Sequence, residues 1–575
     1  MKNTVPLSAS EPSKEPDRVP PESRAQGADS MPTWLAYALI GAVALLAHGL
    51  ALNADFYMDD FPHILEHEFV TEAEWDPNLK FRAIPYALYR QIYAIAGPSS
   101  VAFHTVNLFI HLCTAFVVFA TAKLFFRRFG LLATDEARMR AAVVGAMAFA
   151  VHPLGTEAVN YARCTMIQLV TLFSLLAAFC ALRWTEKRDL SSIVGAFGFS
   201  LLAAFSKTPG IFHAGLNLFI IGIVFFDRSW IRRARNWSNG PGRSRAIATC
   251  VAITIAILWL VPKWTRTIWG VVAIGGREFV DHWFTQGRVV WGYMTRMVAP
   301  VDLTSDHLLA WTRSPTVDAA AGVGLLLFIA LGTAIAVGLF KPKTRVLCTL
   351  LALIIGPLAL RFAYPIYEHF VEYRAYPALP WLGVLAGLGF GILSANRAKP
   401  AFWAAFAVIT AGTTMSALRS AVWSDATALA RNALEAYPLN NRPRTQLQAA
   451  AYRAGDYAEV LRLEKDIRAA YLAQAKFNEL NLYGRQLDPD RAIYDLVGCE
   501  QFVTLAIAEM KNSKEAVRFA NERIDHYRNH LGLEKESEIE KALESLLKAR
   551  NLLEEHGEAY DLRKAQAKAV KGTGR

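Results

Sequence analysis

The chain is poor in cysteine and lacks any paired cysteine motif. Its six cysteines are scattered through 575 residues, mostly inside apolar runs, and none belongs to a CxxC pair. This excludes a disulfide framework and a structural zinc site, because both need cysteines at defined spacings. We expect the cysteines to be small buried hydrophobic residues.

Charged residues are also scarce, at 19% of the chain against 53% hydrophobic residues, and they are unevenly distributed. Nearly all the long apolar runs fall in 34–420, whereas 421–575 is rich in charge. The net charge of +11 does not indicate nucleic-acid binding, because the basic residues lie in short loops and no nucleic-acid-reading module is present. The pattern predicts a membrane domain at 34–420 and a water-soluble domain at 421–575.

The apolar runs predict an all-α, polytopic membrane domain of about eleven spans, since about 20 apolar residues cross a bilayer as a helix. Residues 1–33 precede the first span and are predicted to form a disordered cytoplasmic tail. The first run lacks a basic n-region and is interpreted as a retained span, not a cleaved signal. The expected spans lie near 34–52, 103–126, 139–152, 165–184, 192–206, 209–226, 246–262, 317–340, 346–362, 377–395 and 400–418.

Basic loops predict how these spans are oriented. Loops containing residues such as Arg127, Arg183, Arg232 and Lys341 all fall on one side if 263–316 stays on the other, and the positive-inside rule makes that side the cytoplasm. The C-terminal domain is then periplasmic or extracytoplasmic, on the outer face of an inner (plasma) membrane. The tryptophan-rich segment 263–316 predicts interfacial helices; a full span inside it would overturn the orientation downstream.

The C-terminal domain is predicted to be helical throughout. Its helix–turn–helix spacing, for example from Leu447 through Gly455 to Glu459, resembles tetratricopeptide (TPR) repeats of about 34 residues. An ordinary helical bundle is the alternative.

Two adjacent acids, Asp59 and Asp60, follow the first span at the predicted outer surface. Carboxylates beside a bilayer are costly unless they are hydrated or functional. They are therefore either catalytic candidates or part of a solvated acidic loop.

A second outer turn, 152–163, brings together His152, Glu157, Tyr161 and Arg163 between two apolar runs. His152 alone is best explained as a capped helix end. The whole cluster, however, indicates a polar site at the interface.

Two later outer turns offer cations. Lys207 lies between two predicted spans, where it either snorkels or binds an anion such as phosphate. Arg374 lies beside Glu372 and could hold a phosphate oxygen in a forked contact or pair structurally with that acid.

These motifs, taken in order from about residue 34 to 470, resemble the transmembrane-and-TPR O-mannosyltransferases and their bacterial protein O-glycosyltransferase relatives. That family belongs to the GT-C superfamily of membrane glycosyltransferases, which use polyprenyl-phosphate sugars. The resemblance implies an all-α GT-C fold and an inverting enzyme that transfers sugar to a Ser or Thr hydroxyl of an exported protein, such as a pilin. A lipid acceptor, as in aminoarabinose transferases, stays open.

The resemblance also assigns roles to the motif residues. Asp59, with Asp60 sharing or positioning, would take the acceptor proton. Lys207, Arg374 and Arg163 would bind the donor phosphate. His152, Glu157, Tyr161 and Glu372 would shape the sugar and acceptor pocket. No metal ligand and no cofactor besides the donor is assigned, and a divalent-metal requirement stays open. The TPR-like domain would recruit the protein acceptor.

Two other classes of function fit the same outline. A transporter would need a polar path at mid-membrane, whereas the polar clusters gather at one face. A non-catalytic assembly scaffold would need only the spans and the helical domain.

Overall fold

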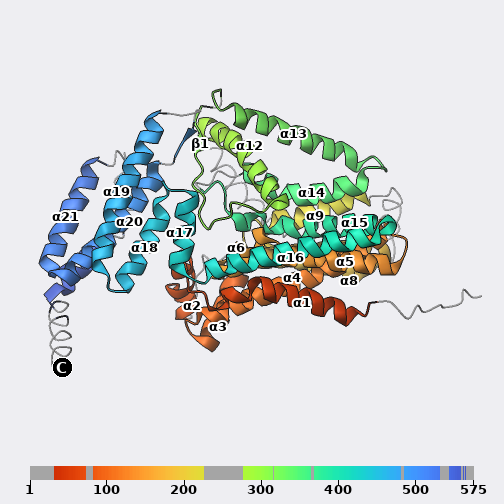
Figure 1. Ribbon diagram of the computed structural model, residues 1–575, viewed down its shortest axis with the longest axis horizontal. Coiled ribbons are helices and arrows are strands. Elements are labelled where there is room, and N and C mark those ends of the chain that lie inside the picture. The colour runs from red at the N-terminus through yellow and green to blue at the C-terminus, as the bar shows by residue number, and fades with distance from the viewer. Residues whose placement is uncertain are drawn as a thin grey trace, which may run out of the picture.

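The computed structural model describes residues 31–72, 82–225, 276–314, 316–363, 368–480, 485–487, 489–530, 543–544, 546–558, 561 and 564. Residues 1–30 of the predicted tail and the predicted span at 246–262 lie outside these residues. Helices dominate the described part of the chain and form a membrane domain with a C-terminal helical domain at one end (Figure 1). The predicted all-α membrane architecture is confirmed.

Seven of the described helical segments are long and apolar enough to cross a bilayer. An eighth is broken, because α5 (Asp135–Ala150) meets the short helices of Pro153–Asn160 at a bend of 52°. Two more apolar helices, α8 (Leu190–Ser206) and α9 (Gly210–Val224), are shorter. Fewer full-length spans than the expected eleven are therefore found in the described residues. The seven are α1 (Thr33–His48), α4 (Ser100–Arg128), α7 (Thr165–Lys187), α13 (Ala319–Leu339), α14 (Arg345–Ala359), α15 (Leu379–Asn396) and α16 (Ala398–Trp423), four of them extended by a 3₁₀ turn.

Glycines bring α5 and α15 together at backbone distance. A Cβ added to Gly145 would lie 2.5 Å from the carbonyl oxygen of Gly383, and one added to Gly387 would lie 2.3 Å from that of Ala141. In lipid, helices associate largely through such close packing of small residues. By contrast, α13 and α16 bury only 17% and 11% of their apolar windows inside the protein, which indicates that these helices face lipid.

The basic loops and the acidic first loop lie at opposite ends of the membrane helices. Arg127 pairs with Glu186 at 2.8 Å, and Arg128 lies 4.6 Å from the ring centre of Phe225, so the ends of α4, α7 and α9 meet at one end. The other end carries the Asp59 loop and the C-terminal domain (Figure 1). This arrangement agrees with the alternation of basic loops. The side of the membrane that each end faces stays a prediction.

Helix α12 (Gly276–Val298) contacts the membrane domain at the end that carries the Asp59 loop. Near its start, the Nε2 atom of His282 is 2.8 Å from the carbonyl oxygen of Arg361; near its end, the carbonyl oxygen of Met297 is 3.0 Å from Nε2 of His152. This position agrees with the interfacial helices expected in 263–316. The first loop, which contains Asp59, folds at the same end into a π-helical turn (Phe61–Leu65), α2 (Glu68–Thr71) and α3 (Ala83–Ala96).

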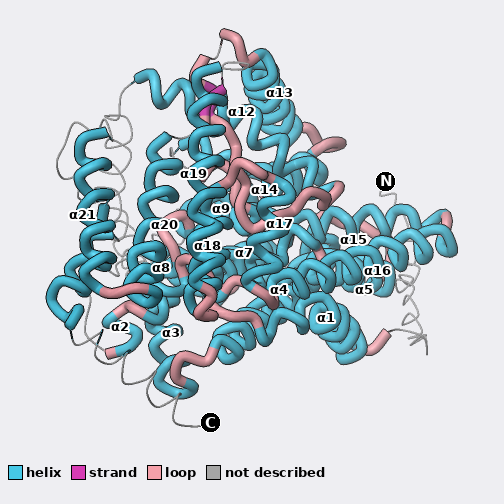
Figure 2. Tube along the Cα trace, turned by 60° about the vertical axis from the view of Figure 1, so that its left-hand side comes forward, coloured by secondary structure: helices cyan, strands magenta, loops and turns pink. Residues whose placement is uncertain are grey.

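The C-terminal domain is built from helical hairpins. The hairpin formed by Asn441–Arg453 and Tyr457–Leu480 turns at Gly455, whose φ of +76° favours glycine. A strand β1 (Trp311–Thr312) pairs antiparallel with β2 (Arg485–Gln486), and Figure 2 shows these short strands beside α12. The predicted helical domain is confirmed, whereas its TPR class stays a prediction. The longer described helices of this domain are α17 (Ala426–Ala436), α18 (Asn441–Arg453), α19 (Tyr457–Leu480), α20 (Pro489–Met510) and α21 (Ser513–His530).

Candidate functional site

The two acids of the first loop have different surroundings. The side chain of Asp59 is 51% exposed and pairs with the guanidinium of Arg163, whereas Asp60 is fully buried. The Asp60 carboxylate accepts the N–H groups of Tyr57 at 2.9 Å and of Arg163 at 2.7 Å, which fastens the loop to the turn before α7. Burial raises the pKa of Asp60 to about 8, because the loss of solvent outweighs these two donors. Of the two acids, Asp59 is the one that reaches solvent.

The turn that presents Asp59 has a strained backbone. Met58 has a φ of +40°, a region that L residues rarely adopt. The N–H of Asp59 donates to the hydroxyl of Tyr161 at 2.9 Å, and the hydroxyl of Tyr57 donates to the carbonyl oxygen of Trp423 at 2.5 Å. Bonds to distant segments thus hold the strained turn, as is common at functional sites.

A cavity of about 360 Å³ opens beside Asp59, a size typical of small-ligand sites. Three residues of the predicted polar turn, Glu157, Tyr161 and Arg163, line it together with Asp59. Glu157 accepts the N–H of Tyr373 at 2.8 Å, so its carboxylate also fixes the opposite wall. The C-terminal domain contributes the remaining wall. Its lining residues are Ala426, Arg442, Thr445, Gln446, Ala449, Ala450, Arg453 and Phe502.

Lys207 and Arg374 lie against a residue of the cavity wall without lining the cavity themselves. The Nζ atom of Lys207 is 4.8 Å, and the Cζ atom of Arg374 is 5.9 Å, from the ring centre of Tyr373. Burial, and to a smaller extent the neighbouring charges of Arg163 and Arg374, lower the pKa of the Lys207 ammonium to about 7. The structure therefore brings the three predicted phosphate-binding cations into one neighbourhood.

Arg361 is a fourth cation of this neighbourhood, and sequence reasoning missed it. It lies in the 3₁₀ turn Leu360–Ala363 that follows α14, inside the span predicted near 346–362. Its Nε and Nη2 atoms are buried and have no hydrogen-bond partner among the described residues. Its charge acts on Arg374 and Tyr373. The sequence did contain a signal for Arg361: like Lys207, it is a basic residue that closely follows an apolar helix.

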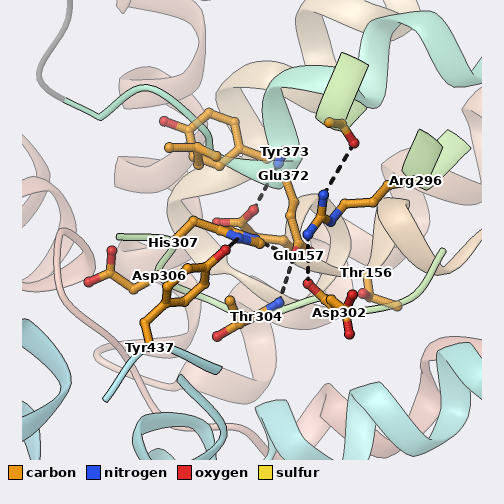
Figure 3. Close-up of polar contacts among 12 residues, drawn as sticks. Thr156, Glu157, Arg296, Asp302, Thr304, Asp306, His307, Glu372, Tyr373 and Tyr437 are labelled. Atoms are coloured by element: carbon orange, nitrogen blue, oxygen red, sulfur yellow. Dashed lines mark hydrogen bonds and ion pairs between the residues drawn. The ribbon is translucent and has the colours of Figure 1, made fainter. Parts of the chain in front are cut away.

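Glu372 is placed in a buried network and does not line the cavity. Its Oε1 atom accepts the N–H of Thr304 at 2.7 Å and lies 2.9 Å from Nε2 of His307 (Figure 3). Its Oε2 atom accepts from Arg419 of α16. The alternative pairing of Arg374 with Glu372 is not found, because Arg374 pairs with Glu368. The contacts of Glu372 join the segment after α12 to α16.

His152 also lies outside the cavity lining. Its Nδ1 atom accepts the N–H of Leu154 at 3.2 Å, and its Nε2 atom is 3.0 Å from the carbonyl oxygen of Met297. Nδ1 therefore caps the turn that begins at Pro153, and Nε2 contacts α12. The capped helix end is the interpretation favoured above for His152 alone. Within the described ranges, no group of three or more His, Cys, Asp or Glu side chains is arranged to hold a metal ion.

Glu368 connects the two domains at the cavity. Its Oε1 atom accepts from Arg442 of α18 at 2.8 Å, and its Oε2 atom is 3.4 Å from Nη2 of Arg374. Arg442 also lies 3.7 Å from Asp306. A cation of the candidate phosphate site is therefore linked through one carboxylate to the C-terminal domain. Sequence reasoning assigned no role to Glu368 or Arg442, since the Arg442 partner is distant in the chain.

Comparison with known proteins identifies two curated relatives and no matching family model. The chain is 26% identical over 218 residues to human protein O-mannosyl-transferase TMTC4, which covers 32% of this chain and 29% of the relative. It is 27% identical over 251 residues to human protein O-mannosyl-transferase TMTC1, covering 39% and 27%. The predicted resemblance is confirmed, although the chain spans less than a third of the length of these relatives.

A solved structure also matches over most of the chain. The crystal structure of ArnT from Cupriavidus metallidurans bound to undecaprenyl phosphate aligns with a TM-score of 0.38 and 14% identity, covering 90% of this chain and 88% of ArnT. At that score the likeness supports no statement about function.

Proposed function

We propose that the chain is a membrane-embedded glycosyltransferase of the GT-C type. It transfers a sugar from a polyprenyl-phosphate donor to a Ser or Thr hydroxyl of an exported protein, such as a pilin, on the outer face of the membrane and with inversion. One observation carries the proposal: a half-exposed carboxylate, Asp59, lines a cavity whose wall residue Tyr373 contacts Lys207, a partly buried cation that pairs with no carboxylate of the described residues. The similarity to two proteins named as O-mannosyl-transferases supports it.

Asp59 serves as the general base. As the acceptor oxygen bonds to the anomeric carbon, the carboxylate takes its proton and the bond from sugar to phosphate breaks, with the electron pair leaving on phosphate. The ion pair with Arg163 positions this carboxylate at the cavity, and the half-exposed Asp59 side chain stays accessible to an acceptor. Asp60 supports the loop, since its oxygens are occupied by backbone N–H groups.

The cations stabilise the phosphate group that departs. A partly buried charge without a paired carboxylate is costly, and neither Lys207 nor Arg361 forms an ion pair within 4.0 Å with a carboxylate of the described residues. A lipid phosphate supplies the missing negative charge. As charge develops on the leaving group, Lys207, Arg374 and Arg163 interact with it more strongly.

Intact-mass measurement of exported proteins tests this function. Cells that carry the chain, lack it, or carry Asp59→Asn are compared. We expect at least one exported protein to lose a hexose or pentose mass both without the chain and with Asp59→Asn. A scaffold would retain the sugar in the variant, and the absence of any chain-dependent sugar mass would overturn the proposal.

A further inference from the structure

One stripe of α18 forms the C-terminal wall of the cavity. The positions recur every three or four residues, so they lie on a single face of the helix. From the first to the last of them the helix rises about 16 Å at 1.5 Å per residue. The stripe consists of Arg442, Thr445, Gln446, Ala449, Ala450 and Arg453.

The middle of the stripe suits a polypeptide backbone. Ala449 and Ala450 project single methyl groups, which leaves room for another chain to lie close to the helix. Beside them, the Nε2 atom of Gln446 is enclosed and has no hydrogen-bond partner among the described residues. An amide nitrogen needs an acceptor when it is removed from water, and a peptide carbonyl provides one.

The two ends of the stripe differ in charge compensation. Arg442 is held by Glu368 and Asp306. Arg453 is exposed, lies 4.8 Å from the ring centre of Phe61, and forms no ion pair with any described residue. Since Phe61 follows Asp59 by two residues, this available cation lies at the end of the stripe nearest the candidate base.

We propose that the stripe is the acceptor subsite, and that it binds an extended polypeptide carrying an acidic side chain close to the hydroxyl that receives the sugar. The proposal rests on the proposed function and specifies its acceptor. An extended chain rises about 3.3 Å per residue, so the stripe spans about five acceptor residues. The acceptor carboxylate pairs with Arg453, and a backbone carbonyl accepts from Gln446.

Peptide binding to the full-length protein in nanodiscs tests this subsite. The probes are two fluorescent peptides with a central Ser, flanked in one by Asp and in the other by Asn. We expect the Asp peptide to bind about tenfold more tightly at low salt, in line with a charge-assisted hydrogen bond. Arg453→Gln should abolish this difference, and Arg453→Lys should keep part of it. Gln446→Leu should weaken both peptides alike.

Arg462→Gln is the matched control, because Arg462 is exposed, pairs with Glu459 and Asp466 of its own helix, and does not line the cavity. It should leave both affinities unchanged. Equal binding of the two peptides to the wild-type protein, or an Asp preference that survives Arg453→Gln, overturns the subsite. Failure to bind either peptide does so as well, while the mass experiment judges the glycosyltransferase separately.

Discussion

At the scale of single residues, Asp59 and Asp60 acquire different properties from their surroundings. Asp59→Asn keeps the shape but removes the basicity, so we expect single-turnover rates to fall at least ~10²-fold while donor binding survives. Asp60→Asn leaves one buried N–H of Tyr57 or Arg163 without its carboxylate oxygen, which costs about 1–3 kcal/mol of stability. Thermal unfolding and turnover in nanodiscs separate the two effects. Wild-type stability with lost turnover in Asp60→Asn would move the base to Asp60.

Lys207 predicts a pH dependence of donor binding. Its pKa falls from 10.5 to about 7 in the folded protein, so its contribution to stability is present above pH 10.5 and is lost as pH falls through 7. A bound phosphate favours the ammonium and reverses this effect. We therefore expect affinity for a polyprenyl phosphodiester, whose own charge is constant here, to increase from pH 8 to pH 6, and Lys207→Met to flatten the increase.

The matched measurement for Lys207 is the difference between wild type and Lys207→Met, because Asp60 also titrates between pH 6 and pH 8. The raised pKa of Asp60 gives a contribution to stability that is present below pH 3.8 and is lost as pH rises through about 8. Subtracting the variant's profile cancels that contribution. An unchanged pH profile in the variant would remove Lys207 from the phosphate site.

The sequence identified site residues where several polar groups share one short turn. Glu157, Tyr161 and Arg163 lie within seven residues of each other, and all line the cavity. Arg361 and Gln446 could not be identified in this way, because each meets its neighbours only through the packing of separate helices. A short sequence motif can identify polar groups that lie in one turn. Contacts between separate helices, such as those of Arg361 and Gln446, become visible only in the tertiary structure.

At the scale of elements, apolar runs were sufficient to predict the helices and insufficient to predict their geometry. The run near 139–152 is helical, but the helix ends at Ala150 and the chain bends before Pro153, which has no N–H to continue the ladder. The polar C-terminal helices were predicted from repeat spacing. That α18 would border the cavity was not predictable, because burial on that face comes from another domain.

The interface of α5 and α15 gives a prediction for helix packing. In Gly387→Ala the new methyl would meet the carbonyl oxygen of Ala141, a backbone atom that cannot move aside. We expect a loss of about 1–3 kcal/mol of stability, typical of overpacking. Gly389→Ala on the same helix meets nothing within 4 Å and should be neutral or slightly stabilising. Unfolding in SDS measures both, and equal effects would contradict the close packing.

At the scale of the whole molecule, the site depends on both domains. Glu368 links Arg374 of the membrane domain to Arg442 of α18, and the buried network of Glu372 includes Tyr437 through His307. The C-terminal domain is therefore part of the cavity as well as a surface for recruitment. A displacement of that domain would change the cavity wall and the support of Arg374 together.

This shared face leads to a prediction of membrane topology. The loop of Asp59 and the C-terminal domain lie at one end of the membrane helices, and the loop after α4 lies at the other, with the more basic loops on its side. Single cysteines introduced as Glu68→Cys and Lys511→Cys should react with a membrane-impermeant maleimide in intact cells. Ala133→Cys should react only after permeabilisation, because positive loops stay in the cytoplasm.

The unmodified chain is the control for labelling of its native cysteines. Labelling of Ala133→Cys alone would place Asp59 in the cytoplasm and exclude an exported protein as acceptor, whereas opposite results at Glu68 and Lys511 would contradict the fold itself.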